Sequence, residues 1–276
     1  MNFAIVFHKE ERVFHLYNEE ISYIMRIMEN EQLEHLYYGK RIPDREGFSY
    51  LHEEARRSQM SVCIPEPGLL SMHYSAQEYP SYGTGDYRSP AFSILQENGS
   101  RVSDFKYRCH EVKSGKPSYL PLPMSYVEKE EEALTLDITL FDNLSQTEMV
   151  LEYTLYCDFP ILCRNIRFTQ KGKEKIFLER AMSMSVEFMD KDFSLLHLSG
   201  AWGRERYLKK RKLEMGIQSI QSLNGTCSGA EHNPFIALLR KGADEDQGKV
   251  YVFNLVYSGN FLSQVEVSTF EMSSVM

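Results

Sequence analysis

Trp202 is the residue of this chain whose setting most favours ligand binding. It is the only tryptophan, and it stands in the stretch LSGAWGRERY, between small residues and a run of charges. Indole offers a flat apolar face and one N–H donor, which suits a sugar ring with C–H groups on one face and hydroxyls around its rim. Arg204 and Arg206 could hydrogen-bond those hydroxyls or anchor the loop through Glu205. On the residues alone, a saccharide platform and a buried loop plug are equal alternatives.

The groups needed for acid–base or nucleophilic catalysis are present, but not in a recognisable arrangement. A glycosidase needs two carboxylates held across its substrate, one of them with a raised pKa. The acidic run at residues 130–132 is expected to be a solvated turn, and the one at 244–246 a loop between strands. The chain contains neither a GxSxG nor an HExxH motif, and its histidines are dispersed. His232 comes nearest to a site because Asn233-Pro234 turns the chain after it, and we expect a structural imidazole there.

Phosphate and nucleic-acid binding are both disfavoured. Gly83-Thr84-Gly85 lacks a following helix and a lysine in the P-loop position. Asp86 and Arg88 would face the same side of an extended segment, and we expect them to pair with each other rather than to reach a polar ligand. The net charge of −8 opposes phosphate binding, so the basic run YLKKRK (residues 207–212) is expected to be a solvated loop or a subunit contact.

The cysteines and the apolar segments indicate a cytoplasmic protein. The five cysteines include no CxxC pair and are expected to be reduced and mostly buried: Cys63, Cys109, Cys157, Cys163 and Cys227. The first apolar stretch meets a charge at Lys9, too early for a signal peptide, and no apolar run approaches the roughly 20 residues that span a bilayer. We predict no metal, no cofactor, no membrane and no nucleic-acid partner.

Strands are the elements expected to position these residues. Apolar and polar residues alternate in LTLDITLFD (134–142), MVLEYTLYC (149–157) and KVYVFNLVY (249–257), which predicts half-buried antiparallel strands. RVFHLYNEEISYIMRIM predicts two strands around residues 18–20, and LEHLYYG predicts a third. Asn98-Gly99 and Lys171-Gly172-Lys173 each stand between strand-like runs and predict hairpins, the first with a type I′ turn.

Long helical periodicity is scarce. FSYLHEEARRSQM (48–60) is the best helix candidate, with an irregular loop as the alternative, and residues 63–90 predict a long ordered connection. Together the patterns predict an all-β fold, a large two-sheet antiparallel β-sandwich with few short helices. We expect residues 1–276 to form a single domain. The chain ends at FEMSSVM just after another strand, so we also expect it to lack the last strands of its sheet.

Several long motifs resemble glycoside hydrolase family 36, the microbial α-galactosidases. In chain order they are LEHLYYGKRIPD, QEYPSYGTGDYRSPAF, LERAMSMSVEF, SGAWGRERY, MGIQSIQSLNG, EHNPFIALL and VYSGNFLSQVEV. The resemblance implies the family's N-terminal β-sandwich, which precedes a (β/α)₈ barrel and a smaller C-terminal β domain. It also implies removal of terminal α-linked galactose from melibiose, raffinose and stachyose with retention, without a metal or an organic cofactor.

The same resemblance implies that catalysis belongs to the barrel. The family's nucleophile lies in a Trp-Asp motif at the end of a barrel strand, whereas Trp202 is followed by Gly203. We therefore expect both catalytic carboxylates to be absent and this chain alone to be inactive. In the family, the matching tryptophan lies in a loop that helps to wall the galactoside pocket, commonly within a tetramer. This favours substrate contact by Trp202 over the plug, with Arg204 and Arg206 supporting the loop.

One departure from the family and one rival function remain. Some relatives carry an acidic residue in a Leu-Asp-Arg context in the loop after the segment that matches LYYGK, and that residue reaches a neighbouring subunit's site. Here FSYLHEEARRS lacks that triplet, so the role is not carried over to Glu53 or Glu54.

The rival function is a free-standing carbohydrate-binding or oligomerisation β-sandwich without catalysis.

Overall fold

The computed structural model describes residues 3–52, 71–225 and 230–276. Within these residues the regular elements are strands and two single 3-10 turns, and neighbouring strands pair antiparallel. The chain divides into two compact units, Met1–Pro117 with Tyr126–Val186, and Ser118–Ser125 with Glu187–Met276. The predicted all-β antiparallel β-sandwich is confirmed, while the expectation of a single domain stays a prediction.

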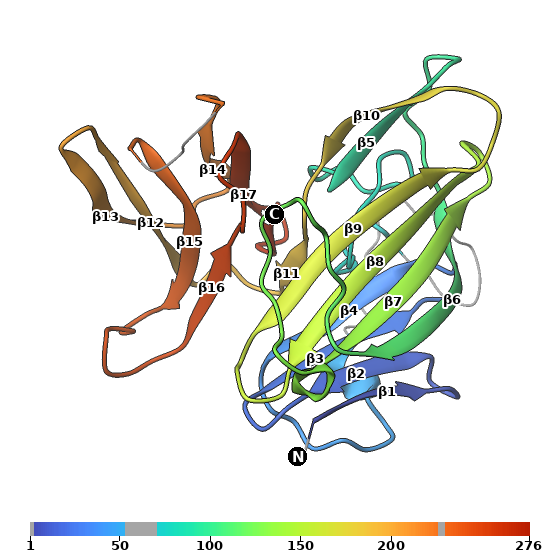
Figure 1. Ribbon diagram of the computed structural model, residues 1–276, viewed down its shortest axis with the longest axis horizontal. Helices are drawn as coiled ribbons and strands as arrows, with labels where there is room; N and C mark the ends of the chain where they lie inside the picture. Colours follow the sequence, from blue (N-terminus) through green and yellow to red (C-terminus); the bar gives the residue numbers. More distant parts are fainter. Residues whose placement is uncertain (1–2, 53–70, 226–229) are drawn as a thin grey trace. The chain divides into compact units, whose positions relative to one another are not determined.

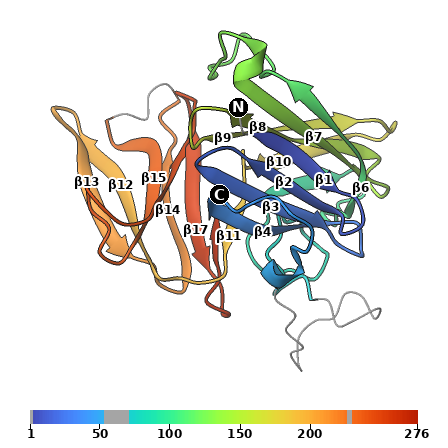
Figure 2. The ribbon, with the colours of Figure 1, turned by 90° about the horizontal axis from the view of Figure 1, so that it is seen from below.

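The first unit contains two four-stranded sheets and one two-stranded ribbon (Figure 1). One sheet has the order β1-β2-β3-β4 and the other β6-β7-β8-β9, and their strands stack as two layers (Figure 2). The ribbon pairs β5 with β10. The bounds are β1 Ala4–His8, β2 Val13–Tyr17, β3 Ile21–Ile27, β4 Leu33–Lys40, η1 Ser49–Leu51, β5 Phe92–Gln96, β6 Phe105–Ser114, η2 Glu130–Glu132, β7 Ala133–Asp142, β8 Thr147–Tyr156, β9 Leu162–Gln170 and β10 Ile176–Ala181.

Alternation along β2 and β3 gives the first sheet two covered faces. Phe14 pairs with Met25 and Leu16 with Tyr23, so their side chains share one face, where all four are buried. On the other face Val13 and Ile24 pack with Phe48, which follows β4. The strand run predicted for β2, β3 and β4 is therefore confirmed, and its strands are more buried than a half-exposed sheet would require.

A buried carboxylate links the two sheets of this unit. Glu78 lies in the long connection before β5 and is fully buried. Tyr23 of β3 and Tyr153 of β8 both donate hydroxyl hydrogen bonds to it, at 2.6 and 2.8 Å. Arg164 of β9 completes the cluster as an ion-pair partner. A buried charge is tolerable only when it is paired and hydrogen-bonded, so these contacts fix the connection against both layers.

The second unit also contains two four-stranded sheets, ordered β13-β12-β15-β16 and β11-β18-β17-β14. An aromatic cluster of Phe188, Phe193 and Tyr251 lies in it, with ring centroids 4.6–6.0 Å apart. The bounds are β11 Val186–Phe188, β12 Phe193–Ala201, β13 Arg204–Lys212, β14 Gly216–Ser222, β15 His232–Arg240, β16 Val250–Asn254, β17 Phe261–Val267 and β18 Ser273–Val275.

The hairpin predicted at Asn98-Gly99 is wrong, although a turn is present. Gly99 has a φ of +83°, and its N–H donates to the carbonyl of Gln96. Asn98 has no positive φ, so the turn lacks the pair of left-handed residues that type I′ requires. After the turn the backbone N–H of Asp104 donates to the carboxylate of Asp142, which directs β6 to pair with β7. Strand β5 is left to pair with β10.

The hairpin predicted around Lys171-Gly172-Lys173 is also wrong. Lys171 donates its backbone N–H to the carbonyl of Gln146, and the Gln170 side chain donates to the carbonyl of Ser145. The turn after β9 is thus bound to the neighbouring β7–β8 turn and does not close on β10. Local turn residues identified the reversal of the chain, but pairing was decided by contacts distant in sequence.

Other expectations are met in part. Strands β7, β8 and β16 fall in the three alternating runs. Of the helix candidate at 48–60, the described part holds only the 3-10 turn η1, and the rest lies outside the described residues. Among the described cysteines, all free, only Cys157 is buried, while Cys163 is intermediate and Cys109 exposed. Within the described ranges, no helix has the length and apolar content to cross a membrane.

Candidate functional site

Trp202 lies at the tip of the β12–β13 hairpin. Ala201 pairs with Arg204, so Trp202 and Gly203 alone make the turn. Gly203 has a φ of +74°, a conformation that glycine adopts without steric cost, and its N–H donates to the Glu205 carboxylate at 2.9 Å. The indole is 92% exposed. The turn therefore holds a large aromatic ring in solvent.

A β-bulge next to the turn requires the other glycine of the motif. Glu205 and Arg206 both stand opposite Gly200, between the pairs Ser199–Tyr207 and Ala201–Arg204. A Cβ on Gly200 would lie 2.0 Å from the backbone oxygen of Arg204. Glycine is thus needed at this position for close backbone approach, and the bulge sets the direction of the hairpin tip.

The structure places the predicted site residues Trp202, Arg204 and Arg206 on one hairpin. The exposed indole contradicts the loop plug, since the ring is not buried in the described chain. Its contact with a sugar stays a prediction. The side chains of Arg204 and Arg206 are exposed and make no hydrogen bond or ion pair within the part of the chain that the structure describes. Their supporting role also stays a prediction, and the observed support of the turn comes from Glu205.

The other residues considered for catalysis or ligand binding make contacts within the fold. Asp86 and Arg88 pair at 2.9 Å and are both buried, as expected. His232 Nδ1 lies 2.8 Å from Ser199 Oγ, which is itself 2.8 Å from His197 Nδ1. The acidic residues 130–132 form the exposed turn η2, and Asp244 accepts backbone N–H groups within its own turn. The role considered for Glu53 or Glu54 falls outside the described residues.

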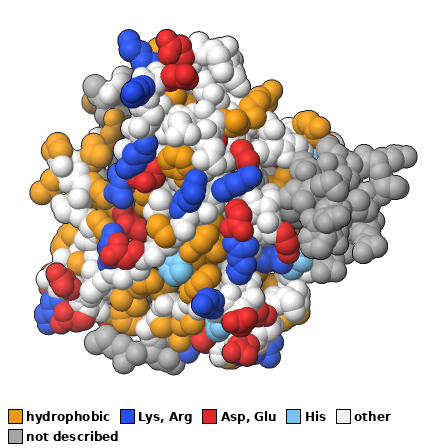
Figure 3. Space-filling view, turned by 90° about the vertical axis from the view of Figure 1, so that its right-hand side faces the viewer, with side chains coloured by type: hydrophobic (Ala, Val, Ile, Leu, Met, Phe, Trp, Pro, Cys, Tyr) orange, Lys and Arg blue, Asp and Glu red, His pale blue; other side chains and the backbone are white. Residues whose placement is uncertain are grey.

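The basic run at residues 207–212 is a strand and not the loop that was one of its two expected forms. It makes up most of β13, whose residues are all exposed. Pairing with β12 along its whole length explains the extended backbone. On the face drawn in Figure 3, acidic and basic side chains are interspersed, without one broad field of a single sign. The face drawn there therefore presents no broad positive patch of the kind that binds nucleic acid.

The motif QEYPSYGTGDYRSP builds the connection that supports the first unit. Tyr79 stacks on Phe92 with centroids 5.5 Å apart and donates its hydroxyl to the carbonyl of Met182 at 2.6 Å. Burial raises the pKa of Tyr79, which keeps the hydroxyl protonated as a donor. Gly83 has a φ of +97°, and a Cβ there would meet Val102 at 2.8 Å. These residues serve packing, so the exposed hairpin remains the candidate site.

An antiparallel β-sandwich protein with an exposed aromatic hairpin is the class that the fold and the site define. The profile of the glycosyl hydrolase family 36 N-terminal domain matches residues 31–276, and the chain belongs to that family. It is 42% identical over 272 residues to the α-galactosidase AgaA of Geobacillus stearothermophilus, covering 99% of this chain and 37% of that protein.

Solved structures agree in fold over nearly the whole chain. The α-galactosidase AgaB from Geobacillus stearothermophilus matches with a TM-score of 0.93 and 43% identity, over 99% of this chain and 37% of that one. A variant of AgaA from the same organism, solved in complex with raffinose, matches with a TM-score of 0.91 and 43% identity, over 95% and 36%. The chain thus spans little more than a third of the length of these relatives.

Proposed function

We propose that this chain is the N-terminal β-sandwich of a retaining α-galactosidase that hydrolyses terminal α-galactosides such as melibiose, raffinose and stachyose. In this proposal a (β/α)₈ barrel supplies the two catalytic carboxylates, and the chain alone is inactive. The sandwich supplies an assembly surface and one wall of the substrate pocket. The relatives that are α-galactosidases, one of them crystallised with raffinose, support this assignment.

The observation that carries the proposal is the exposure of Trp202. A tryptophan in solvent gains nothing from burial in its own domain, yet two glycines, a bulge and the Glu205 carboxylate hold it at the hairpin tip. An indole face fits the C–H face of a galactosyl ring, and its N–H can donate to a hydroxyl. The neighbouring guanidinium groups of Arg204 and Arg206 stay available to support the loop in the assembled enzyme.

Replacement of Trp202 by Ala in the enzyme that combines this domain with its barrel tests the pocket role. We expect KM for raffinose to rise about tenfold with kcat little changed, as for loss of a contact made equally in ground and transition states. Phe177→Ala is the matched control, because Phe177 is another exposed aromatic, 59% accessible, in the other unit. Unchanged KM and kcat in the Trp202 variant would remove Trp202 from the pocket.

Location and assembly complete the proposal. We place the protein in the cytoplasm because Cys109, Cys157 and Cys163 are free thiols. We also propose a homo-oligomer, tetrameric by family resemblance. The rival function, a free-standing carbohydrate-binding sandwich, requires that the isolated chain bind sugar. Titration of the isolated chain with melibiose, monitored by Trp202 fluorescence, separates the two, since only the rival predicts saturable binding without a barrel.

A further inference from the structure

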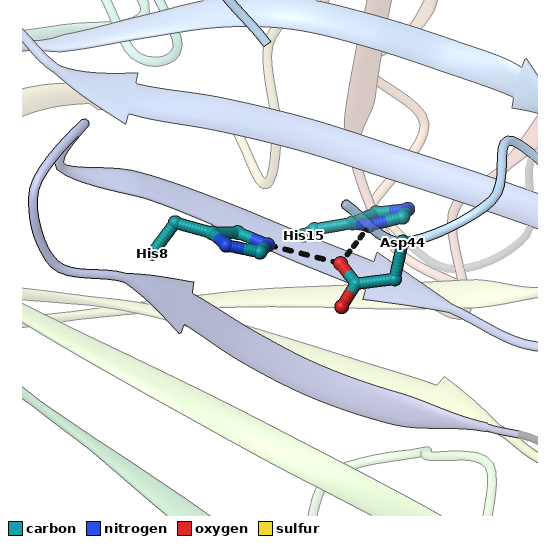
Figure 4. A group of neighbouring side chains, drawn as sticks. All are labelled: His8, His15 and Asp44. Carbon is teal, nitrogen blue, oxygen red and sulfur yellow. Dashed lines mark hydrogen bonds and ion pairs between the residues drawn. The ribbon is translucent and has the colours of Figure 1, made fainter. Parts of the chain in front are cut away.

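Two histidines of the first sheet meet on one face. His8 pairs with Val13 and His15 pairs with Val6 across β1 and β2, so the alternation of side chains puts both imidazoles on the same side, as diagonal neighbours. Asp44, from the segment after β4, places its carboxylate between them (Figure 4). One carboxylate oxygen, Oδ1, lies 2.9 Å from His8 Nε2 and 2.8 Å from His15 Nδ1.

The three side chains form a cluster with an aromatic ring against both imidazoles and one partly exposed side. Phe48 is fully buried, and its ring lies edge-on to both imidazoles, at centroid distances of 5.4 Å to His8 and 5.1 Å to His15. The side chain of His15 is 0% exposed, that of His8 12% and that of Asp44 27%. A ligand can therefore approach from the side of Asp44 and His8, while the aromatic ring restricts the movement of both histidines.

Outer contacts hold the group in place. His15 Nε2 lies 2.9 Å from Ser22 Oγ, which accepts the backbone N–H of Ile42 at 2.9 Å. Histidines that bind metals are commonly oriented in this way through their second ring nitrogen. The carboxylate of Glu11 accepts the N–H groups of Gly47 and Phe48, which fixes the segment that carries Asp44.

The chemistry of the three side chains suits a cation, because imidazole nitrogens and carboxylate oxygens are ligands that zinc accepts in proteins. Arg41 is a nearby positive charge that opposes a cation, and its guanidinium is paired with Glu19 at 3.2 Å. Two imidazoles and one carboxylate are therefore the candidate ligands.

We propose that His8, His15 and Asp44 form a binding site for a divalent transition-metal ion, with Zn²⁺ as the best match. The set of two nitrogens and one oxygen suits tetrahedral zinc, with a water molecule in the fourth position on the open side. The three ligand atoms lie within 4.8 Å of one another. Around zinc they would be about 3.3 Å apart, so small shifts of Asp44 and of the two imidazoles would complete the site. The ion would join the β1–β2 hairpin to the segment after β4.

Zinc binding to the whole chain tests the site. Metal-free protein is titrated with Zn²⁺ in competition with a chromophoric chelator. We expect one strong site per chain, and we expect His8→Gln and Asp44→Asn each to weaken it by at least about tenfold. Ser22→Ala should weaken binding less than either ligand variant. His232→Ala is the matched control, because this histidine contacts Ser199 and no member of the cluster.

Spectroscopy of the unaltered protein makes the test independent of variant folding. On zinc addition, ring ¹⁵N signals of His8 and His15 should shift while those of His232 stay in place. With Co²⁺, visible bands of a tetrahedral nitrogen–oxygen site should appear without the strong near-ultraviolet absorption of thiolate ligation. Absence of a strong zinc site, equal affinity in the ligand variants and the control, or thiolate absorption as the sole signature would overturn the proposal. The group would then be a hydrogen-bonded triad only.

Discussion

Glu78 and Arg164 form a buried ion pair in the first unit, with Oε1 of the carboxylate 2.8 Å from Nη1 of the guanidinium. Their side chains are 0% and 5% exposed. Burial alone would raise the pKa of Glu78, but the charge of Arg164 and a hydrogen bond from His35 outweigh it, and that pKa is lowered. Arg164 also lies over the ring of Tyr153, 4.0 Å from its centroid.

Loss of Arg164 should therefore destabilise the chain strongly. Arg164→Met leaves the carboxylate of Glu78 buried without its counter-charge, and we expect the free energy of unfolding to fall by about 3–5 kcal/mol. Urea unfolding followed by circular dichroism measures the change. The control is Arg101→Met, which breaks the exposed pair of Arg101 with Glu179 at 2.7 Å and should leave the midpoint nearly unchanged. Equal losses in the two variants would contradict the importance of burial.

The cost of Arg164→Met should depend on pH. In the wild type the folded-state pKa of Glu78 is below its ordinary value of 4.5, so its stabilising contribution is present above pH 4.5 and is lost as pH falls through the folded pKa. In the variant the charge of Arg164 is lost while the hydrogen bonds from His35 and Tyr23 remain, so we expect the pKa of Glu78 to be higher than in the wild type and less of its stabilising contribution to be present at pH 7. We expect the difference in the free energy of unfolding between variant and wild type to be larger at pH 7 than at pH 4. A difference that is the same or larger at pH 4 would refute this. The double variant Glu78→Gln/Arg164→Met should show no such dependence on pH.

The two glycines of the hairpin should differ in how they tolerate alanine. Gly200→Ala brings a Cβ within 2.0 Å of a backbone oxygen, and this clash cannot be relieved without opening the bulge. We expect the free energy of unfolding to fall by about 3 kcal/mol or more. In Gly203→Ala the Cβ meets no atom within 4 Å, and the positive φ alone should lower the free energy of unfolding by about 1–2 kcal/mol. Gly99→Ala, with a φ of +83° and open space, should match Gly203→Ala. A smaller loss for Gly200→Ala than for Gly203→Ala would argue against the bulge.

Trp202 should report its own exposure. Because the chain has one tryptophan, its fluorescence has a single source. In the isolated chain we expect emission close to that of free tryptophan in water and strong quenching by acrylamide. In the enzyme that includes the barrel, emission should shift to shorter wavelength, and bound melibiose should reduce quenching. Blue-shifted, protected emission from the isolated chain would show that the ring is buried.

The sequence predicted strands well where one chain segment contains the whole signal. Alternation located β7 and β8, and the Asn18 turn located β2 and β3, because the side-chain period and local turn chemistry act within a few residues. Partner choice was not predictable in this way. Strand β5 pairs with β10, about eighty residues later in the chain, through contacts that no local pattern encodes.

The two candidate sites also differ in whether neighbouring residues in the sequence reveal them. Trp202 could be selected from the sequence because its glycines and charges are immediate neighbours. The group of His8, His15 and Asp44 could not, since it depends on the pairing of His8 with Val13 and on the path of a segment that follows two further strands. The local signal is limited to His8 and His15 standing on either side of the β1–β2 turn.

Strand β13 lies at the outer end of its sheet, and among the described strands only β12 pairs with it. Such edges recruit further strands and lead to aggregation unless something prevents it. Here Lys209, Lys210, Arg211 and Lys212 stand in succession along that edge. A second copy aligned there would bring the same positive charges into register and be repelled, whereas an acidic partner would not. We expect the three lysines and the arginine to oppose edge-to-edge pairing of this strand with a second copy.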